Sequence, residues 1–279
     1  MTALWEHKID CHCHVLDPGR YPYRDDVKYR PSGQEIGTAA QFNAICDAYH
    51  VDHALLVGPN SGYGEDNRCL LDVIAQGGGR FKGIAVVPND VSEDHLADLR
   101  RQGIVGIAFN ATYHGVDYYL KAAPLIERVA ALDLFLQVQG EGDQLISLVR
   151  LVEGHAVNIL VDHCGRPNLD HGLLQPGFAA LCELGRTGHA VVKLSGLAKF
   201  SRTTFPYEDA WPYVRSLVDS FGLERCLWGS DWPFLRAPER LDYGPLLSVV
   251  DRLFPDPQER KKLLWETPMR LFGFGRPAA

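Results

Sequence analysis

Eight short apolar runs recur along the chain, and at least one segment with helical spacing follows each of them. The runs are Trp5–Asp10, His53–Val57, Phe81–Val87, Ile104–Phe109, Leu134–Val138, Asn158–Asp162, Ala190–Leu194 and Arg225–Trp228. Strands that alternate with helices predict a parallel sheet with helices outside it. Eight such units in 279 residues predict the α/β class and a (β/α)8 TIM barrel. We expect one domain over residues 1–279, because a barrel of this length forms a single core.

The segments between these runs have defined ends. Thr38 and Ser92 are candidate N-caps, whereas Gly77-Gly78-Gly79 and Gly103 are stop signals. The expected helices are Thr38–Tyr49, Glu65–Gln76, Ser92–Gln102, Tyr118–Leu132, Asp143–Glu153, Pro176–Arg186, Tyr207–Phe221, Arg240–Phe254 and Asp256–Trp265. An open doubly wound sheet is the alternative, but it would carry a glycine-rich phosphate loop after the first strand. Residues 10–18 contain no glycine, which favours the barrel.

The composition argues against several classes of partner. The formal net charge is −7 and no basic block stands out, so we expect no nucleic-acid partner. The sequence contains no run of about 18 apolar residues, so we predict no membrane span. The start of the chain lacks the apolar core of a signal peptide. The seven cysteines are odd in number and scattered, which is typical of the reducing cytoplasm. We therefore predict a cytoplasmic protein with a small-molecule partner, and a homo-oligomer is compatible with exposed barrel helices.

Two histidines follow the first apolar run. Because side chains alternate along a strand, His12 and His14 are expected on one side, with Cys11 and Cys13 facing away toward the packing side. Two imidazoles that converge from one strand form half of a metal site or one wall of a polar pocket. The alternative is that both histidines only make hydrogen bonds at a strand end.

Two more candidates stand at the ends of later apolar runs, where a parallel barrel has its active site. His163 follows Asp162, and Gly165 then starts a loop. Asp231 follows an apolar strand, and we expect burial to raise its pKa and to suit it to general-base chemistry. The alternatives are a loop histidine paired with Asp162 and an aspartate that caps the next segment.

One divalent metal ion, with zinc as the preferred candidate, can be held by His12, His14, His163 and Asp231 with a position open for water. The same four residues can also act without a metal, in which case the histidines bind a carbonyl and Asp231 activates water. Both arrangements predict hydrolysis of an acyl bond or a related reaction.

Further polar residues follow the other strands and are candidates for substrate binding. They are Ser61, Asn110, Tyr113, Gln139, Arg166, Lys193 and Arg202. Arg166 and Arg202 are the preferred carboxylate ligands among them, because a guanidinium binds a carboxylate with two hydrogen bonds. For each residue the alternative is an ordinary loop or surface position. The irregular segment Val15–Gly37 is expected to form a lid over the top of the barrel.

Several motifs in this order resemble the amidohydrolase superfamily, in particular the amidohydrolase 2 branch that contains 2-pyrone-4,6-dicarboxylate lactonase and sugar-lactone hydrolases. The matching pieces are Asp10-x-His12-x-His14, Asp162-His163-x-Gly165-Arg166-Pro167, Val192–Gly196, Trp228–Pro233 and Thr267–Phe274. The resemblance implies a (β/α)8 barrel in which Asp231 activates water and the three histidines polarise the carbonyl or bind metal. It also matches Ser61 to a substrate-contacting serine and Arg202 to a carboxylate-binding arginine.

Two departures from the family pattern narrow the substrate and the cofactor. At the fourth strand the pyrone-dicarboxylate enzymes have a pattern similar to Gly-Val-Arg-Phe-Asn, whereas this chain has Ala108 in place of the arginine. The loss of an arginine for a second carboxylate argues against that dicarboxylate as the substrate. Gln137 and Gln139 occupy the fifth strand where a bridging lysine would be needed for two metals, which argues against a binuclear site. We therefore predict a lactonase that opens a small anionic lactone. The alternatives are a metal-dependent non-oxidative decarboxylase of an aromatic or unsaturated acid, and a binding protein without catalysis.

Overall fold

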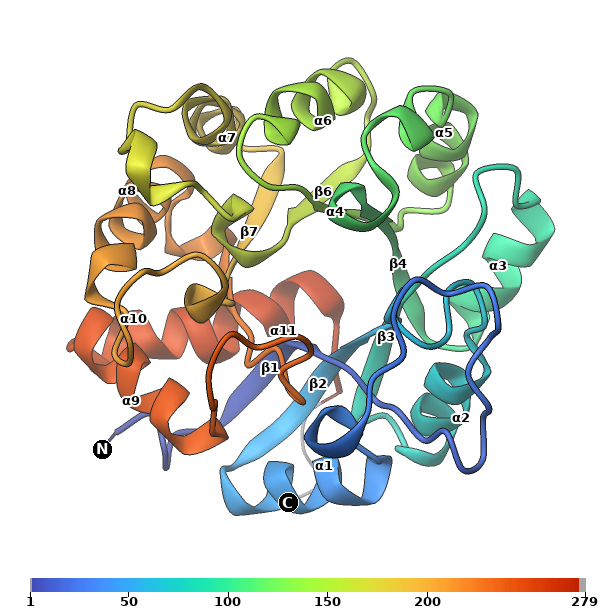
Figure 1. The fold of residues 1–279 in the computed structure, drawn as a ribbon, viewed down its shortest axis with the longest axis horizontal. Helices are drawn as coiled ribbons and strands as arrows, with labels where there is room; N and C mark the ends of the chain where they lie inside the picture. Colours follow the sequence, from blue (N-terminus) through green and yellow to red (C-terminus); the bar gives the residue numbers. More distant parts are fainter. Residues whose placement is uncertain (1, 276–279) are drawn as a thin grey trace.

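The computed structural model describes residues 2–275, and its eight strands form one parallel sheet in sequence order. The strands are β1 Lys8–Cys13, β2 Val51–Val57, β3 Phe81–Ala85, β4 Ile104–Asn110, β5 Phe135–Gln139, β6 Asn158–Val161, β7 Ala190–Leu194 and β8 Cys226–Trp228. Helices surround the strands as a ring (Figure 1). The predicted α/β class and (β/α)8 barrel are thereby confirmed.

The helices have the following bounds. They are α1 Ala39–Ala48, α2 Arg68–Gln76, α3 Glu93–Arg101, α4 Ala111–His114, α5 Ala123–Ala131, α6 Gln144–Val152, α7 Pro176–Arg186, α8 Trp211–Phe221, α9 Tyr243–Leu253, α10 Pro257–Lys261 and α11 Thr267–Phe272. Thr38 and Ser92 cap α1 and α3 as predicted, because each side chain accepts a hydrogen bond from the backbone three residues later.

Some predicted helix ends are wrong, for identifiable reasons. The helix expected from Tyr118 begins at Ala123, and the one expected from Tyr207 begins at Trp211. In both, a proline stands in the first turn, where its missing N–H costs no helical hydrogen bond. The final helix expected over Asp256–Trp265 ends at Lys261, and a π-helical turn then leads into α11.

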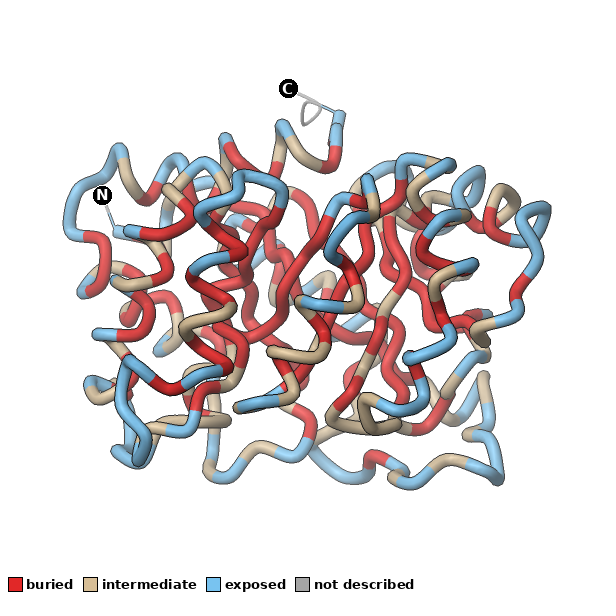
Figure 2. Tube along the Cα trace, turned by 90° about the horizontal axis from the view of Figure 1, so that it is seen from above, coloured by how far each residue is buried: buried red, intermediate tan, exposed pale blue. Residues whose placement is uncertain are grey.

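The apolar core has two parts. Their buried residues occupy the middle of the molecule (Figure 2). The larger part fills the space between helices and sheet. The smaller part comprises alternate strand residues such as Ile9, Leu55 and Leu160, together with Phe272 and Phe274 from the C-terminal region. Alternation along each strand therefore places one set of side chains against the helices and the other inside the barrel.

Strand β1 lies three residues later in the chain than predicted, so His12 is part of the strand. Its pairing with β2 is irregular between Asp10 and Cys13, as in a β-bulge. Cys13 belongs to the core beneath the helices, as predicted for the packing side. Cys11 instead packs in the smaller cluster with Ile9, so the prediction that both cysteines face outward is wrong for Cys11.

The barrel closes between β1 and the segment after β8 through a few specific hydrogen bonds. The backbone N–H of His14 donates to the carbonyl of Trp232, and that of Asp231 donates to the carbonyl of His12, both at 2.7 Å. The two segments approach closely, because a Cβ added to Gly229 would lie 2.6 Å from the Cβ of His12. Only glycine allows this approach, which brings His12, His14 and Asp231 to one place.

The segment 15–37 packs against the loops at the carboxyl ends of the strands. The backbone N–H of Lys28 donates to Tyr113 Oη at 2.7 Å, and that of Arg24 donates to the carbonyl of Gly62 at 2.9 Å. Glu35 accepts a hydrogen bond from the backbone of Arg236 at 2.6 Å. The segment thus contacts the loops after β2, β4 and β8, and its role as a lid stays a prediction.

Two global properties bear on the predictions from composition. The seven cysteines are all buried and form no disulfide bond. Among residues 2–275, no helix combines the length and the apolar character that a membrane crossing requires.

Candidate active site

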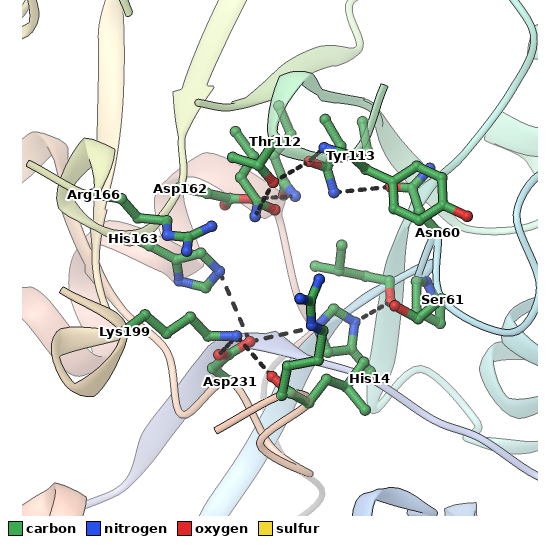
Figure 3. A pocket seen from close by; sticks show the side chains of 18 of the residues that line it. His14, Asn60, Ser61, Thr112, Tyr113, Asp162, His163, Arg166, Lys199 and Asp231 are labelled. Carbon is green, nitrogen blue, oxygen red and sulfur yellow. Dashed lines mark hydrogen bonds and ion pairs between the residues drawn. The ribbon is translucent and has the colours of Figure 1, made fainter. Parts of the chain in front are cut away.

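Three imidazoles converge on one carboxylate at the carboxyl ends of the strands. The Nε2 atoms of His14, His12 and His163 lie 3.5, 3.7 and 3.8 Å from Asp231 Oδ1. Figure 3 shows His14 and His163 pointing toward Asp231 from different elements. All four residues are buried. The structure therefore brings together the four residues that the sequence proposed as the catalytic set.

The backbone conformation at this site is unusual for non-glycine residues. His163 has φ 51° and Asp231 has φ 61°, both in the left-handed region. Such conformations cost of order 1 kcal/mol and persist only where the surroundings fix them. Gly196 packs directly against His163, since a Cβ there would lie 2.7 Å from the imidazole Nδ1. The loops after β6 and β8 thus present His163 and Asp231 in fixed orientations.

The second ring nitrogen of each histidine has its own partner. His14 Nδ1 donates to the carbonyl of Val57 at 2.7 Å, which fixes the tautomer because a carbonyl only accepts. His163 Nδ1 lies 2.9 Å from Ser195 Oγ, and His12 Nδ1 lies 3.2 Å from Asp162 Oδ1. These partners orient all three Nε2 atoms toward Asp231, in the way that outer residues orient metal-binding histidines.

The ionisation of Asp231 differs from the prediction. Burial raises the pKa of its carboxyl group, but Lys199 and His163 outweigh that effect and hold the pKa well below its ordinary value. The ammonium of Lys199 lies 2.8 Å from Asp231 Oδ2. The expectation that burial raises the net pKa of Asp231 is therefore wrong, because the sequence did not show that Lys199 would lie beside it. Asp231 is an ionised carboxylate at neutral pH.

A second buried ion pair lies beneath the histidines. Lys193 Nζ is 3.1 Å from Asp162 Oδ1, 2.5 Å from Gln137 Oε1 and 3.2 Å from His12 Nδ1. Burial raises the pKa of Asp162, but Lys193 and His12 reverse this and hold it well below its ordinary value. Burial and the charge of Lys193 lower the pKa of His12 to about 4, so its imidazole is neutral at neutral pH.

The four central residues fit a single divalent cation. Asp231 Oδ1 is buried and accepts no hydrogen bond from the described residues, although three imidazole Nε2 atoms surround it. Potential ligand atoms of His12, His14 and Asp231 lie within 4.8 Å of one another, as do those of His12, Asp162 and His163. Neutral imidazole nitrogens and carboxylate oxygens are the donors that zinc takes.

A cavity of about 420 Å³ opens above this cluster. Its lining combines cations, carboxylates and neutral polar side chains with a smaller number of apolar residues. The polar lining residues are His14, Asn60, Ser61, Asn110, Thr112, Tyr113, Gln137, Gln139, Glu141, Asp162, His163, Arg166, Lys199, Asp231 and Arg236. Asn60, Thr112 and Tyr113 lie across the cavity from Asp231 (Figure 3). A small polar ligand can therefore contact Asp231 on one side and amides or hydroxyls on the other.

Five of the seven predicted substrate-binding residues line this cavity. They are Ser61, Asn110, Tyr113, Gln139 and Arg166. The other two lie elsewhere. Lys193 is fully buried in its ion pair with Asp162, below the cavity. Arg202 is exposed and forms an ion pair with Asp170, outside the residues that line the cavity.

Seven polar residues of the cavity lining were not among the predicted site residues, and they are Asn60, Thr112, Gln137, Glu141, Asp162, Lys199 and Arg236. Lys199 comes from the turn after β7, Asn60 from the loop after β2 and Arg236 from the loop after β8. Asn60 directly precedes the predicted Ser61, and Lys199 lies five residues after the end of β7, so position after a strand was an available signal. Arg236 has φ 53°, and no sequence pattern predicts that backbone conformation.

Comparison with known proteins gives consistent relatives. The amidohydrolase family model matches residues 9–274. The 4-sulfomuconolactone hydrolase of Hydrogenophaga intermedia is 30% identical over 95% of this chain and 88% of its own length. The 2-pyrone-4,6-dicarboxylate hydrolase of Comamonas testosteroni is 29% identical over 95% and 89%.

Solved structures share the fold. A Pseudomonas putida protein assigned as a 2-pyrone-4,6-dicarboxylic acid hydrolase has a TM-score of 0.83 and 28% identity, over 96% of this chain and 98% of its own. An amidohydrolase from Burkholderia multivorans with bound zinc has a TM-score of 0.74 and 22% identity, over 97% and 100%. A 2,6-dihydroxybenzoate decarboxylase from Rhizobium has a TM-score of 0.64 and 16% identity, over 96% and 99%, which is a likeness of fold alone.

The lowered pKa of His12 predicts a loss of stability in acid. An unfolded histidine with a pKa near about 6.5 binds a proton that folded His12 does not bind until the pH approaches about 4. Stability from this residue is therefore complete above about pH 6.5 and falls as the pH drops toward 4. Between pH 7 and pH 5, the chelator-treated wild-type protein should lose about 2 kcal/mol more of its unfolding free energy than the His12→Gln variant loses. Urea denaturation at the two pH values measures both losses. Equal losses in both proteins would contradict the prediction.

The buried ion pair predicts a large and asymmetric mutational effect. Lys193→Met leaves the Asp162 carboxylate buried without its ammonium, so we expect a loss of about 3–5 kcal/mol of unfolding free energy. Adding Asp162→Asn to this variant removes the unpaired charge and should recover part of the loss. Urea denaturation measures both effects, with Lys121→Met on the surface as the control. A double variant less stable than Lys193→Met would show that the charge pair does not cause the effect.

Proposed function

The chain belongs to the amidohydrolase family, and we propose that it hydrolyses a small anionic lactone by attack of water on the ring carbonyl. Relatives over nearly the whole chain are lactone hydrolases by name, which supports the reaction class. The observation that carries the proposal is the ionised Asp231 carboxylate beneath the cavity, with three imidazoles directed at its Oδ1 atom.

Each central residue has a role in this reaction. Asp231 accepts a proton from the attacking water, whose oxygen forms a bond to the carbonyl carbon. The ring C–O bond then breaks, and Asp231 returns the proton to the leaving alkoxide, so the product is an open-chain hydroxy acid. The tautomers of His12 and His163 are not fixed by a carbonyl, so these two rings can donate from Nε2 to the negative charge that develops on the carbonyl oxygen, whereas His14 presents a lone pair at Nε2. The depressed pKa of Asp231 keeps it ready to accept a proton at neutral pH.

We further propose that His12, His14, His163 and Asp231 hold one divalent cation, with zinc as the preferred ion. When bound, such an ion polarises a carbonyl and lowers the pKa of bound water. The unpartnered Oδ1 of Asp231 and the partners of the three Nδ1 atoms support this assignment. Lys199 keeps Oδ2 engaged, which leaves Oδ1 as the oxygen directed at the histidines.

The cavity supports a small substrate with limited negative charge. Its volume of about 420 Å³ is at the small end of ligand sites. Ala108 on β4 lines it, so no side chain offers a second guanidinium at that point. Ser61, Asn110 and Gln139 present neutral polar groups that suit ring and carbonyl oxygens. A location in the cytoplasm and a homo-oligomer stay predictions from the sequence.

Asp231→Asn tests the catalytic base. The amide keeps the shape but cannot accept a proton, so we expect kcat to fall by at least about 100-fold. Lactone hydrolysis is measured through the release of acid, and the thermal midpoint tests whether the variant is folded. Asp219→Asn, at an exposed position of α8, is the matched control. Substantial residual turnover by a folded Asp231→Asn protein would overturn the assignment of the base.

Removal of metal tests the cofactor. Dialysis against a chelator should remove about one divalent ion per chain together with activity, and zinc should restore both. Metal content is measured by elemental analysis. The His14→Asn variant should bind less metal, and metal content is its only readout. If chelated protein free of metal keeps full turnover, the metal assignment fails, whereas lactone hydrolysis by Asp231 and the histidines stands.

A further inference from the structure

The charged residues in and below the cavity are matched in pairs, with one exception. Lys193 is paired with Asp162 at 3.1 Å, and Lys199 is paired with Asp231 at 2.8 Å. The other pair is Arg166 Nη2 with Glu141 Oε2 at 3.3 Å. These pairs account for every carboxylate that lines the cavity. Each of these three cations therefore has its charge balanced before any ligand enters.

The remaining cation of the cavity lining is Arg236, in the loop after β8. Its guanidinium forms no ion pair with any carboxylate of residues 2–275, although the side chain lines the cavity. The guanidinium carbon lies 5.4 Å from the centre of the Tyr29 ring, at a distance typical of a cation–π contact. The cavity is thus left with one positive charge without a counter-ion.

The position of Arg236 is fixed by its surroundings. Its backbone is left-handed, with φ 53°, and its N–H donates to Glu35 Oε1 at 2.6 Å. The hydroxyl of Tyr29 donates to the other carboxylate oxygen of Glu35. Glu35 therefore connects the backbone of Arg236 to the ring on which the guanidinium rests. This arrangement orders the side chain in advance, which lowers the entropy lost on binding an anion.

The amide, hydroxyl and methyl groups contributed to the lining by the segments at the ends of β2, β4 and β5 supply no further cation. Asn110 Nδ2 donates to Asn60 Oδ1 at 3.0 Å, and Gln139 Nε2 donates to Thr112 Oγ1 at 3.2 Å. Ala108 adds only a methyl group. A ligand with two carboxylates would therefore leave one of them among neutral groups, where its desolvation is poorly compensated.

We propose that Arg236 binds the acid group of the substrate, and that the site selects lactones with a single carboxylate. This assignment rests on the proposed lactone hydrolysis and adds the group that recognises the substrate. A guanidinium binds a carboxylate through two parallel hydrogen bonds, and here it also gains the counter-ion that it lacks. Arg236 takes the place in recognition that the sequence suggested for Arg202, whose charge is already balanced by Asp170 outside the cavity.

The test compares two lactones that differ only in charge, muconolactone with one carboxylate and the corresponding carboxamide. Wild-type protein should prefer the carboxylate. Arg236→Met should raise KM for the carboxylate about 10–100-fold with little change in kcat, and should leave the carboxamide unaffected. Arg236→Lys keeps the charge without the planar fork and should fall between the two. Arg240→Met, on the same loop and outside the cavity, is the matched control.

The outcomes separate the two proposals. If wild-type protein hydrolyses neither lactone, the proposed function fails. If it hydrolyses both with equal kcat/KM, or if Arg236→Met affects both equally, the assignment of Arg236 fails while lactone hydrolysis stands. A selective loss for the carboxylate in Arg202→Met, with Arg236→Met unchanged, would transfer the recognition role to Arg202. The thermal midpoint of each variant confirms that it is folded.

Discussion

The structure depends on one buried carboxylate that joins the two ends of the sheet. Asp10 on β1 accepts hydrogen bonds from the backbone of His12 and Ser230, and from the hydroxyls of Ser230 and Tyr243, at 2.6–3.1 Å. Burial raises the pKa of Asp10, and these four hydrogen bonds oppose that shift. Because β1 and β8 form no ladder of their own, these contacts and two backbone hydrogen bonds close the barrel there. The hydrogen bonds that close the barrel therefore also hold the residues of the site in place.

Below the cavity, charge is placed in the interior only with its partner. An isolated buried charge is expensive, whereas a pair with further hydrogen bonds is tolerated. Lys193 satisfies Asp162 and also contacts Gln137 and His12, so it acts on the site through orientation rather than by touching a ligand. Lys199 has the corresponding relation to Asp231. The imidazoles between these two pairs are then available as ligands or hydrogen-bond partners.

The sequence predicted the architecture and the four central residues because both follow from local patterns. Alternating strands and helices determine a parallel barrel, and a parallel barrel brings residues after different strands to one end. The first strand was predicted three residues too early because the prediction ended it at the polar Asp10, whereas the pairing with β2 continues to Cys13. Lys199 and Arg236 were missed, and Arg202 was preferred, because loop side chains are placed by left-handed backbone and by contacts between distant loops. Those contacts leave no periodic signal in the chain.

The local pairing of charges has a consequence for how such a site can diverge. Each buried pair changes safely only when both partners change together, so the reaction centre resists stepwise substitution. Arg236 is exposed, touches none of those pairs and lies on a loop. A new ligand charge could be accommodated there by exchange of a single codon, without disturbance of the buried network. The fold thus separates the buried residues of the reaction centre from an exposed residue of substrate preference, so a change of preference at Arg236 should cost little stability.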